Sequence, residues 1–373
     1  MQNDIFHTNK SKTMIYRFKE GIYYPEKIII PDGIEYICNH AFKNCTRLKE
    51  VILPKSIIDI GEFAFCNCSS LEKVIIPSDT ISNIREFTFN NCVNLKEINI
   101  PDGVLNINIK AFSNCISLEN IKIPDSVINI ANYAFSECKS LKEIILPNNI
   151  TKINKGSFYK CKKLKNINIP NNIVFIGDGA FEECSSLENI ILPNSVVLVG
   201  DAIFCNCIKL KNITLSDNIT KIGKCFFYNC KELKHITLPN GIIEIGDNAF
   251  SNCISLENIT LPNSVEKLNK EAFIYCINLK EIILSNNLTK ISNSTFYSCE
   301  NLKEIIIPDK VTIIENQAFK YCSTLKNVYI PDTIKEIGNW VFYGCKSLRE
   351  ISIPNTAIIG KEIFSYCYSL KTT

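Results

Sequence analysis

One motif, Ala-Phe-x-x-Cys-x-x-Leu-x-x-Ile-x-Ile-Pro, recurs along nearly the whole chain with little change in its spacing. Its cysteines are 23 residues apart at every step except one of 24 and a last one of 22. They are Cys45, Cys68, Cys92, Cys115, Cys138, Cys161, Cys184, Cys207, Cys230, Cys253, Cys276, Cys299, Cys322, Cys345 and Cys367. A repeat this short cannot enclose a core alone, so the copies must stack into a solenoid. We therefore expect a capping segment at residues 1–24 and a single solenoid domain at residues 25–373.

The order of residue types within one repeat predicts a strand followed by turns. Ile121 and Ile123 are two residues apart, the spacing of side chains on one face of a strand, and Lys122 points the other way. Pro124 ends the strand because it has no N–H to donate. The apolar spacing in the segment Asn132–Ser140 favours one helical or 3₁₀ turn. Stacked about 4.8 Å apart, the strands would form one parallel sheet.

The two ends and one spacing change depart from the repeat. Met14–Phe18 and Ile22–Tyr24 alternate weakly, which predicts one or two strands that cap the N-terminal edge. The extra residue of the 24-residue step lies within Ser78–Thr80, where we expect a turn bulge. The last repeat has no polar cap, which leaves self-association through the C-terminal edge as a possibility.

The segment Cys253–Phe273 reads Cys-Ile-Ser-Leu-Glu-Asn-Ile-Thr-Leu-Pro-Asn-Ser-Val-Glu-Lys-Leu-Asn-Lys-Glu-Ala-Phe. This pattern resembles the BspA-like, or Treponema-type, leucine-rich repeats. The resemblance implies an α/β solenoid, a right-handed horseshoe of about 15 repeats. Its parallel β-sheet would form the concave face, with short helical or 3₁₀ turns on the convex side. Members of the family are similar in acting as non-enzymatic binding surfaces, often as adhesins at microbial surfaces.

Composition and charge exclude several classes of function. The net charge of +3, from 41 basic and 38 acidic residues, is too small and too evenly spread to indicate nucleic-acid binding. No stretch of about 18 apolar residues occurs, so membrane insertion is not expected. The first twelve residues contain no apolar run typical of a signal peptide. This favours a cytoplasmic location, with the cell surface reached by a non-classical route as the alternative.

Nineteen cysteines raise the question of disulfides or metal. Fifteen occupy one inward position, where free cysteine is commonly buried and where parallel side chains are poorly placed to form disulfides. Of the remainder, Cys66 and Cys205 are expected to face solvent. So many unpaired thiols fit a reducing compartment. We find no catalytic motif, so no metal, no cofactor and no enzymatic activity are expected.

The outward strand positions are the candidates for function. Ile283, Ile306 and Tyr329 fall on consecutive predicted strands and form an exposed apolar strip beside Lys303 and Lys326. Exposed apolar patches with polar rims mark interaction sites. A second set of outward residues is polar and could supply hydrogen bonds: Asn166, Asn189, Asn212, His235 and Asn258. The alternative interpretation of these columns is a solvated face on which opposite charges compensate each other.

These observations predict a non-enzymatic scaffold that binds another protein through its concave sheet. The leading hypothesis is an intracellular protein-interaction module. The alternative is a microbial cell-surface adhesin or surface antigen of the BspA-like type.

Overall fold

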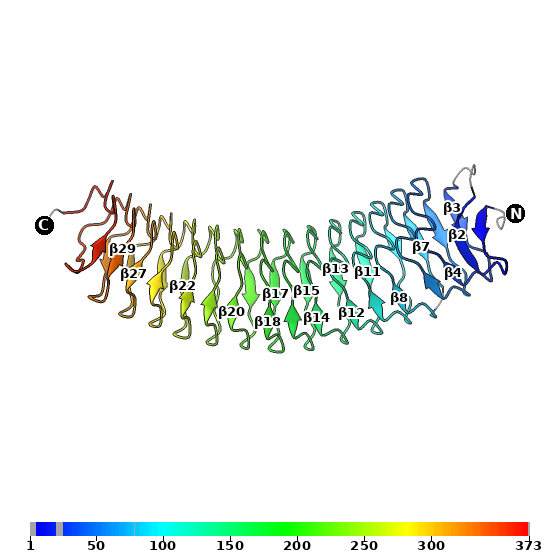
Figure 1. The fold of residues 1–373 in the computed structure, drawn as a ribbon, viewed down its shortest axis with the longest axis horizontal. Coiled ribbons are helices and arrows are strands. Elements are labelled where there is room, and N and C mark those ends of the chain that lie inside the picture. Colours follow the sequence, from blue (N-terminus) through cyan, green and yellow to red (C-terminus); the bar gives the residue numbers. More distant parts are fainter. Residues whose placement is uncertain (1–4, 20–24, 78, 372–373) are drawn as a thin grey trace. The chain divides into compact units, whose positions relative to one another are not determined.

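The chain forms two compact units, residues 1–187 and residues 188–373. The computed structural model describes residues 5–19, 25–77 and 79–371. Within each unit, successive coils stack and most contribute one longer and one shorter parallel strand (Figure 1). Each unit is therefore a parallel β-solenoid, as predicted. That the solenoid forms a single domain from residue 25 to residue 373 stays a prediction.

The longer strands form the first strand column, at the predicted position after the Leu. Their central Ile or Val is buried in most coils while its neighbours point outward, because side chains alternate along a strand. In the first unit these strands are β3 (Lys27–Ile29), β5 (Glu50–Ile52), β7 (Lys73–Ile75), β9 (Glu97–Ile98), β11 (Asn120–Lys122), β13 (Glu143–Ile145) and β15 (Asn166–Asn168). In the second they are β17 (Asn189–Ile191), β19 (Asn212–Thr214), β22 (Asn258–Thr260), β24 (Glu281–Ile283), β26 (Glu304–Ile306) and β28 (Asn327–Tyr329).

A second strand column follows the Pro turn and was not predicted. Each of its strands has two residues, and in all but β30 only the second is buried, so these strands have no alternation that a sequence could reveal. In the first unit these strands are β4 (Tyr36–Ile37), β6 (Asp59–Ile60), β8 (Asn83–Ile84), β10 (Asn106–Ile107), β12 (Asn129–Ile130), β14 (Lys152–Ile153) and β16 (Phe175–Ile176). In the second they are β18 (Leu198–Val199), β20 (Lys221–Ile222), β21 (Glu244–Ile245), β23 (Lys267–Leu268), β25 (Lys290–Ile291), β27 (Ile313–Ile314), β29 (Glu336–Ile337) and β30 (Ile358–Ile359).

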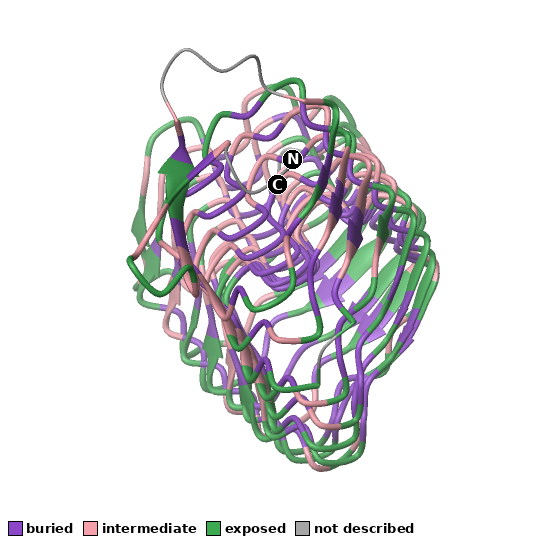
Figure 2. Cartoon of the chain, turned by 90° about the vertical axis from the view of Figure 1, so that its right-hand side faces the viewer, coloured by how far each residue is buried: buried purple, intermediate pink, exposed green. Residues whose placement is uncertain are grey.

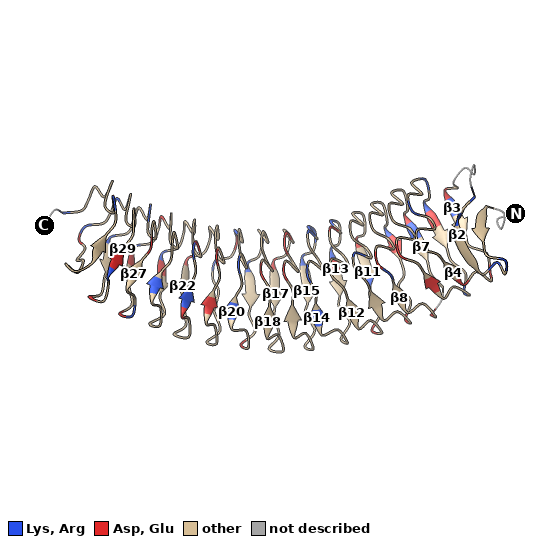
Figure 3. Ribbon diagram, viewed as in Figure 1, with Lys and Arg blue, Asp and Glu red and all other residues tan. Residues whose placement is uncertain are grey.

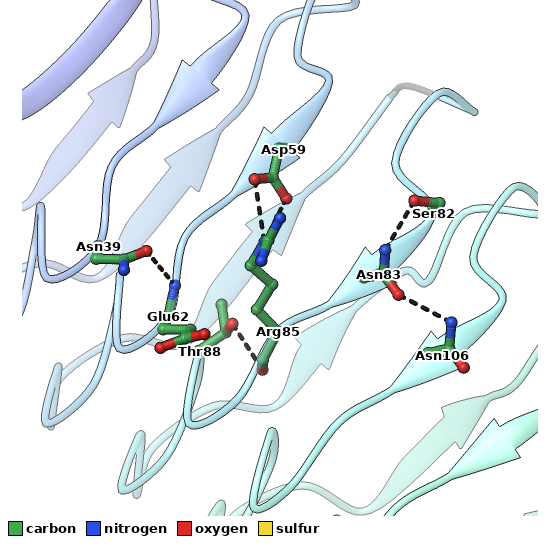
Figure 4. Close-up of polar contacts among 8 residues, drawn as sticks. All are labelled: Asn39, Asp59, Glu62, Ser82, Asn83, Arg85, Thr88 and Asn106. Atoms are coloured by element: carbon green, nitrogen blue, oxygen red, sulfur yellow. Dashed lines mark hydrogen bonds and ion pairs between the residues drawn. The ribbon is translucent and has the colours of Figure 1, made fainter.

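Side chains link neighbouring coils beside the shorter strands. Arg85 Nε donates to both carboxylate oxygens of Asp59, at 2.8 and 3.0 Å (Figure 4). Asn106 Nδ2 donates to Asn83 Oδ1 at 2.9 Å in the same column (Figure 4). Each contact joins one coil to the next: the Asn pair links the paired strands β8 and β10, and the Arg85–Asp59 pair links β6 to the coil of β8, with which β6 does not pair.

The segment that carries the Ala-Phe-x-x-Cys motif is a series of turns, and the predicted helical or 3₁₀ turn is wrong. The described residues contain no helix of either type. Tyr133 and Glu137 have φ values of 59° and 60°, and such left-handed residues interrupt a helix. Alternate N–H groups also bond to the next coil instead of within their own: Phe135 N–H donates to Ser157 O at 3.0 Å. The turn segment is thus a third line of hydrogen bonds between coils.

The core is built from identical residues stacked in columns. The Phe rings lie nearly parallel, with Phe250 and Phe273 centroids 5.1 Å apart at 6°. The motif Leu and Cys side chains are buried beside them through most of both units. Viewed along the stack, buried residues gather inside the coils and exposed ones outside (Figure 2). Each coil therefore depends on its neighbours for its core.

An antiparallel hairpin caps the N-terminal end of the stack. It consists of β1 (Phe6–Thr8) and β2 (Met14–Phe18), and β2 pairs in parallel with β4. Phe6 and Phe18 place their rings 5.9 and 5.2 Å from that of Phe42, which extends the Phe column into the cap. This confirms the strand predicted at Met14–Phe18. Ile22–Tyr24, where a capping strand was predicted, lie outside the described residues, and so does Ser78 of the bulge predicted within Ser78–Thr80.

Candidate functional site

The outward side chains of the longer strands make up the surface that we call the long-strand face. Three of them, Ile283, Ile306 and Tyr329, are 53%, 67% and 57% exposed, although all are large and apolar. Ile306 lies opposite Tyr329 in the β26–β28 ladder, and Ile283 is at the same position of β24. We call these three residues the apolar strip. The structure brings them together as the sequence predicts, and their role in binding stays a prediction.

Lys303 and Lys326 immediately precede β26 and β28, two strands of the apolar strip, and are exposed. Among residues 188–371, all of which the structure describes, neither forms an ion pair with a carboxylate. Other lysines of the same column do: Lys142 Nζ is 2.6 Å from Glu119, and Lys280 Nζ is 2.7 Å from Glu257. Basic and acidic residues are interspersed along the coils (Figure 3), and the alternative of charge compensation describes much of this column. It leaves the ammonium groups of Lys303 and Lys326 without a carboxylate partner within residues 188–371.

The predicted polar residues are all exposed on the long-strand face. Asn166 lies in the first unit and the other four in the second. Asn212 Nδ2 donates to Asn189 Oδ1 at 2.7 Å. His235 forms an isolated parallel bridge with Asn258 and belongs to no strand. The four second-unit residues thus lie on successive coils with hydrogen-bonding groups toward solvent.

A feature beside these polar residues was missed by the sequence analysis. Ile213 and Ile236, which stand at the buried position of the long-strand column, are partly exposed. They line a surface cavity of about 730 Å³ together with Asn189, Asn212 and His235. A signal for it exists in the sequence: Ile203 and Phe226 replace the small residue that most other repeats place before the motif Phe.

The cysteines form a buried column, in agreement with the interpretation from sequence. Cys138 Sγ donates to Phe112 O at 3.2 Å, and most coils repeat this contact. Burial raises the pKa of Cys138 to about 12, so the thiol stays protonated. Cys66 and Cys205, predicted to face solvent, are instead buried, at 5% and 8% exposure. No cluster of three or more potential metal ligands occurs within the described part of the chain.

A family model described as the BspA type leucine-rich repeat region matches residues 15–142, 105–230, 197–326 and 289–373. These overlapping matches span the chain from residue 15 to its last residue. The chain belongs to the BspA-type leucine-rich-repeat family. Proteins of this fold are generally scaffolds without enzymatic activity.

Solved structures of bacterial leucine-rich-repeat proteins are similar to this BspA-type chain. A leucine-rich repeat protein from Bacteroides ovatus is 27% identical with a TM-score of 0.75, and the match covers 98% of this chain and 96% of the other. A leucine rich cell surface protein from Faecalibacterium prausnitzii is 25% identical with a TM-score of 0.57, and covers 96% and 92%. No curated protein matches the sequence.

These similarities bear on location as well as fold. One of the two similar bacterial proteins is described as a cell surface protein, and neither description supports the predicted cytoplasmic location. Across residues 5–19, 25–77 and 79–371, the structure has no helix with the length and apolar character that crossing a bilayer requires.

Proposed function

We propose that this BspA-type chain is a non-enzymatic scaffold that binds a protein partner through its long-strand face. The observation that carries the proposal is the apolar strip, where three large apolar side chains on consecutive coils are more than half exposed. Exposed apolar patches with polar rims mark interaction sites, and Lys303 and Lys326, which form no ion pair within residues 188–371, supply such a rim. Aromatic residues such as Tyr329 are enriched where interfaces derive most of their binding energy.

The location of this binding is proposed to be the cell surface. Support comes from the similar bacterial protein that is described as a cell surface protein. An adhesin or surface antigen therefore becomes the preferred form of the scaffold, and an intracellular interaction module becomes the alternative. Self-association through the C-terminal edge remains a separate prediction.

The test is affinity capture from the surroundings of the producing cells, with the chain immobilised. Ile306→Asp places a charge in the centre of the strip and should reduce partner recovery at least about tenfold, since a charge buried at an interface without a partner is costly. Ile243→Asp is the matched control, because Ile243 is an exposed isoleucine outside the longer strands. Equal recovery by both variants and wild type would contradict the proposal.

A further inference from the structure

The hydrogen-bond ladder of the longer strands is interrupted between β19 and His235–Thr237. One coil earlier the ladder is intact, and Leu192 N–H donates to Thr214 O at 2.9 Å. The equivalent bond, from Leu215 N–H to Thr237 O, is absent. Among residues 188–371, all of which the structure describes, no other main-chain hydrogen bond joins β19 to His235–Thr237 either. The edge of β19 and the extended residues His235–Thr237 therefore face each other without pairing.

The interruption coincides with oversized residues in the core. The position before the motif Phe holds a small residue in most coils: Ala41, Ala64, Thr88, Ala111, Ala134, Ser157, Ala180, Ala249, Ala272, Thr295 and Ala318. Ile203 and Phe226 occupy it in the two coils beside the interruption and are fully buried. The Phe226 ring lies 5.6 Å from Phe204 and 4.8 Å from Phe227, centroid to centroid. Overpacking of this kind displaces backbone, and the shorter strands β18 and β20 of the same coils also fail to pair.

The opening exposes apolar core at its base. Ile213 and Ile236 are partly exposed there, whereas the equivalent residues of paired coils, such as Ile190 and Ile259, are buried. The cavity of about 730 Å³ is lined by these two side chains together with other apolar residues, among them Ile191, Leu215 and Leu238. Its lining includes a single charged side chain, that of Asp217.

The ladder is also interrupted elsewhere, for example between β24 and β26, and the surface cavities at two of these other interruptions differ in chemistry. The cavity beside β9 and β11 is lined by five charged side chains: Lys73, Lys96, Glu97, Glu119 and Lys122. The one beside Ile351 lies in the last coil and is lined by Glu350 and Lys371. The opening at His235 is thus the least charged of the three, and it lies among the predicted hydrogen-bonding residues.

The groups around the opening define what could occupy it. In a parallel ladder, alternate residues direct their N–H and C=O toward the same neighbour, so those of Ile213, His235 and Thr237 face the gap. A partner must offer both acceptors and donors at strand spacing, which an extended polypeptide does. Ile213 and Ile236 would contact an aliphatic side chain of that polypeptide. Because the lining has only one charged side chain, it favours a polypeptide segment without charges.

We propose that the opening between β19 and His235–Thr237 receives an aliphatic side chain from an extended, uncharged segment of a protein partner, whose main chain bonds to the unpaired groups at its edges. The proposal rests on the proposed function, since it assigns an anchor point on the same long-strand face. It adds a preference for an aliphatic side chain on an extended main chain, which the apolar strip does not supply.

The test is selection of a phage-displayed library of random dodecapeptides on the immobilised full-length chain. Thr237→Arg fills the opening from an exposed position that lines it. Thr260→Arg is the matched control, because Thr260 is exposed at the same position of a paired strand, opposite Ile283. We expect the enriched peptides to have a central Ile, Leu or Val and few charges. The Thr237→Arg variant should retain these peptides at least about tenfold less well than wild type, and the Thr260→Arg variant should retain them fully. Circular dichroism of both variants verifies that they fold.

The outcomes separate this proposal from the proposed function. If no peptide is enriched, or if both arginine variants retain the peptides equally, the anchor point is refuted, even when Ile306→Asp still abolishes partner capture. An N-methyl group at the central amide of a selected peptide should weaken binding about tenfold, and unchanged binding would refute the main-chain bonds. If wild type sediments as a dimer and Thr237→Arg as a monomer, the occupant is a second copy of the chain and the proposal of a separate partner is wrong.

Discussion

At the scale of single residues, burial determines the chemistry of the cysteine column. Cys138 and Cys253 lie among apolar side chains, each donating to a main-chain carbonyl of the preceding coil. Burial disfavours the thiolate and raises the pKa of both to about 12. A sequence with nineteen cysteines invites a redox or metal function, yet repetition at one inward position was enough to predict the buried column. The burial of Cys66 and Cys205 was not predictable, because it depends on contacts with the neighbouring coil.

The raised thiol pKa predicts a loss of stability at alkaline pH. An unfolded thiol ionises near pH 9, so between about pH 9 and 12 the folded state holds more protons and the free energy of unfolding falls as pH rises. The difference in that free energy between wild type and Cys253→Ala should therefore shrink by about 1.4 kcal/mol per pH unit above pH 9. Urea unfolding at pH 8, 9 and 10 measures it, with Thr260→Ala as a pH-independent control. A stability difference that stays constant with pH would contradict a raised thiol pKa for Cys253.

The Phe column predicts a large cost for removing one ring. Phe273 is fully buried and stacks between Phe250 at 5.1 Å and Phe296 at 5.7 Å. Phe273→Ala should lower the free energy of unfolding by about 3–5 kcal/mol, because the stacked neighbours cannot fill the cavity. Thr260→Ala, on the exposed face, should stay within about 0.5 kcal/mol of wild type. Chemical denaturation compares the two, and similar midpoints would show that the column is not the core.

At the scale of elements, the longer strands were predictable and the other two parts of the coil were not. Alternation around Ile121 and a following Pro mark the strand in the sequence. The turn segment was misread because Phe135 and Cys138 have helical spacing. The contrary signal was the residue before each motif Cys, often Asn, such as Asn67 and Asn91, which tolerates left-handed φ.

Gly156 tests the left-handed geometry of the turn segment. Its φ is 57°, and a Cβ there would lie 2.3 Å from the ring of Tyr133 in the preceding coil. Gly156→Ala should therefore cost more than the roughly 1–2 kcal/mol of a left-handed alanine alone. In a Tyr133→Ala background, Gly156→Ala should lower the free energy of unfolding by less, because the ring that the new Cβ meets is gone. Urea unfolding of the four proteins of this double-mutant cycle measures the difference. A Gly156→Ala variant as stable as wild type would contradict this turn geometry.

At the scale of the whole molecule, repetition determines the scaffold and variation determines the candidate sites. The period alone predicted a stacked solenoid of about fifteen coils, and the outward columns located the apolar strip. The interrupted ladder was not predicted: Ile203 and Phe226 mark its two coils in the sequence, but how far they displace the backbone depends on their packing against neighbouring coils. Function therefore has to be sought where one coil differs from the next.

The proposed surface location predicts that the intact producing cell exposes the chain. A membrane-impermeant amine reagent should label Lys303 and Lys326 before lysis, since both are exposed. Labelling only after lysis would support the intracellular alternative. A cytosolic enzyme of the same cell serves as the control for intactness.

The central claim, that a protein binds the long-strand face, is tested most directly by hydroxyl-radical footprinting with and without the captured partner. Tyr329 on this face and Tyr321 on the turn segment are 57% and 38% exposed, so both react in the free chain. We expect the partner to protect Tyr329 and Ile306 several-fold and to leave Tyr321 unchanged. Protection of Tyr321 with Tyr329 still reactive would place the interface on the turn segment and contradict the claim.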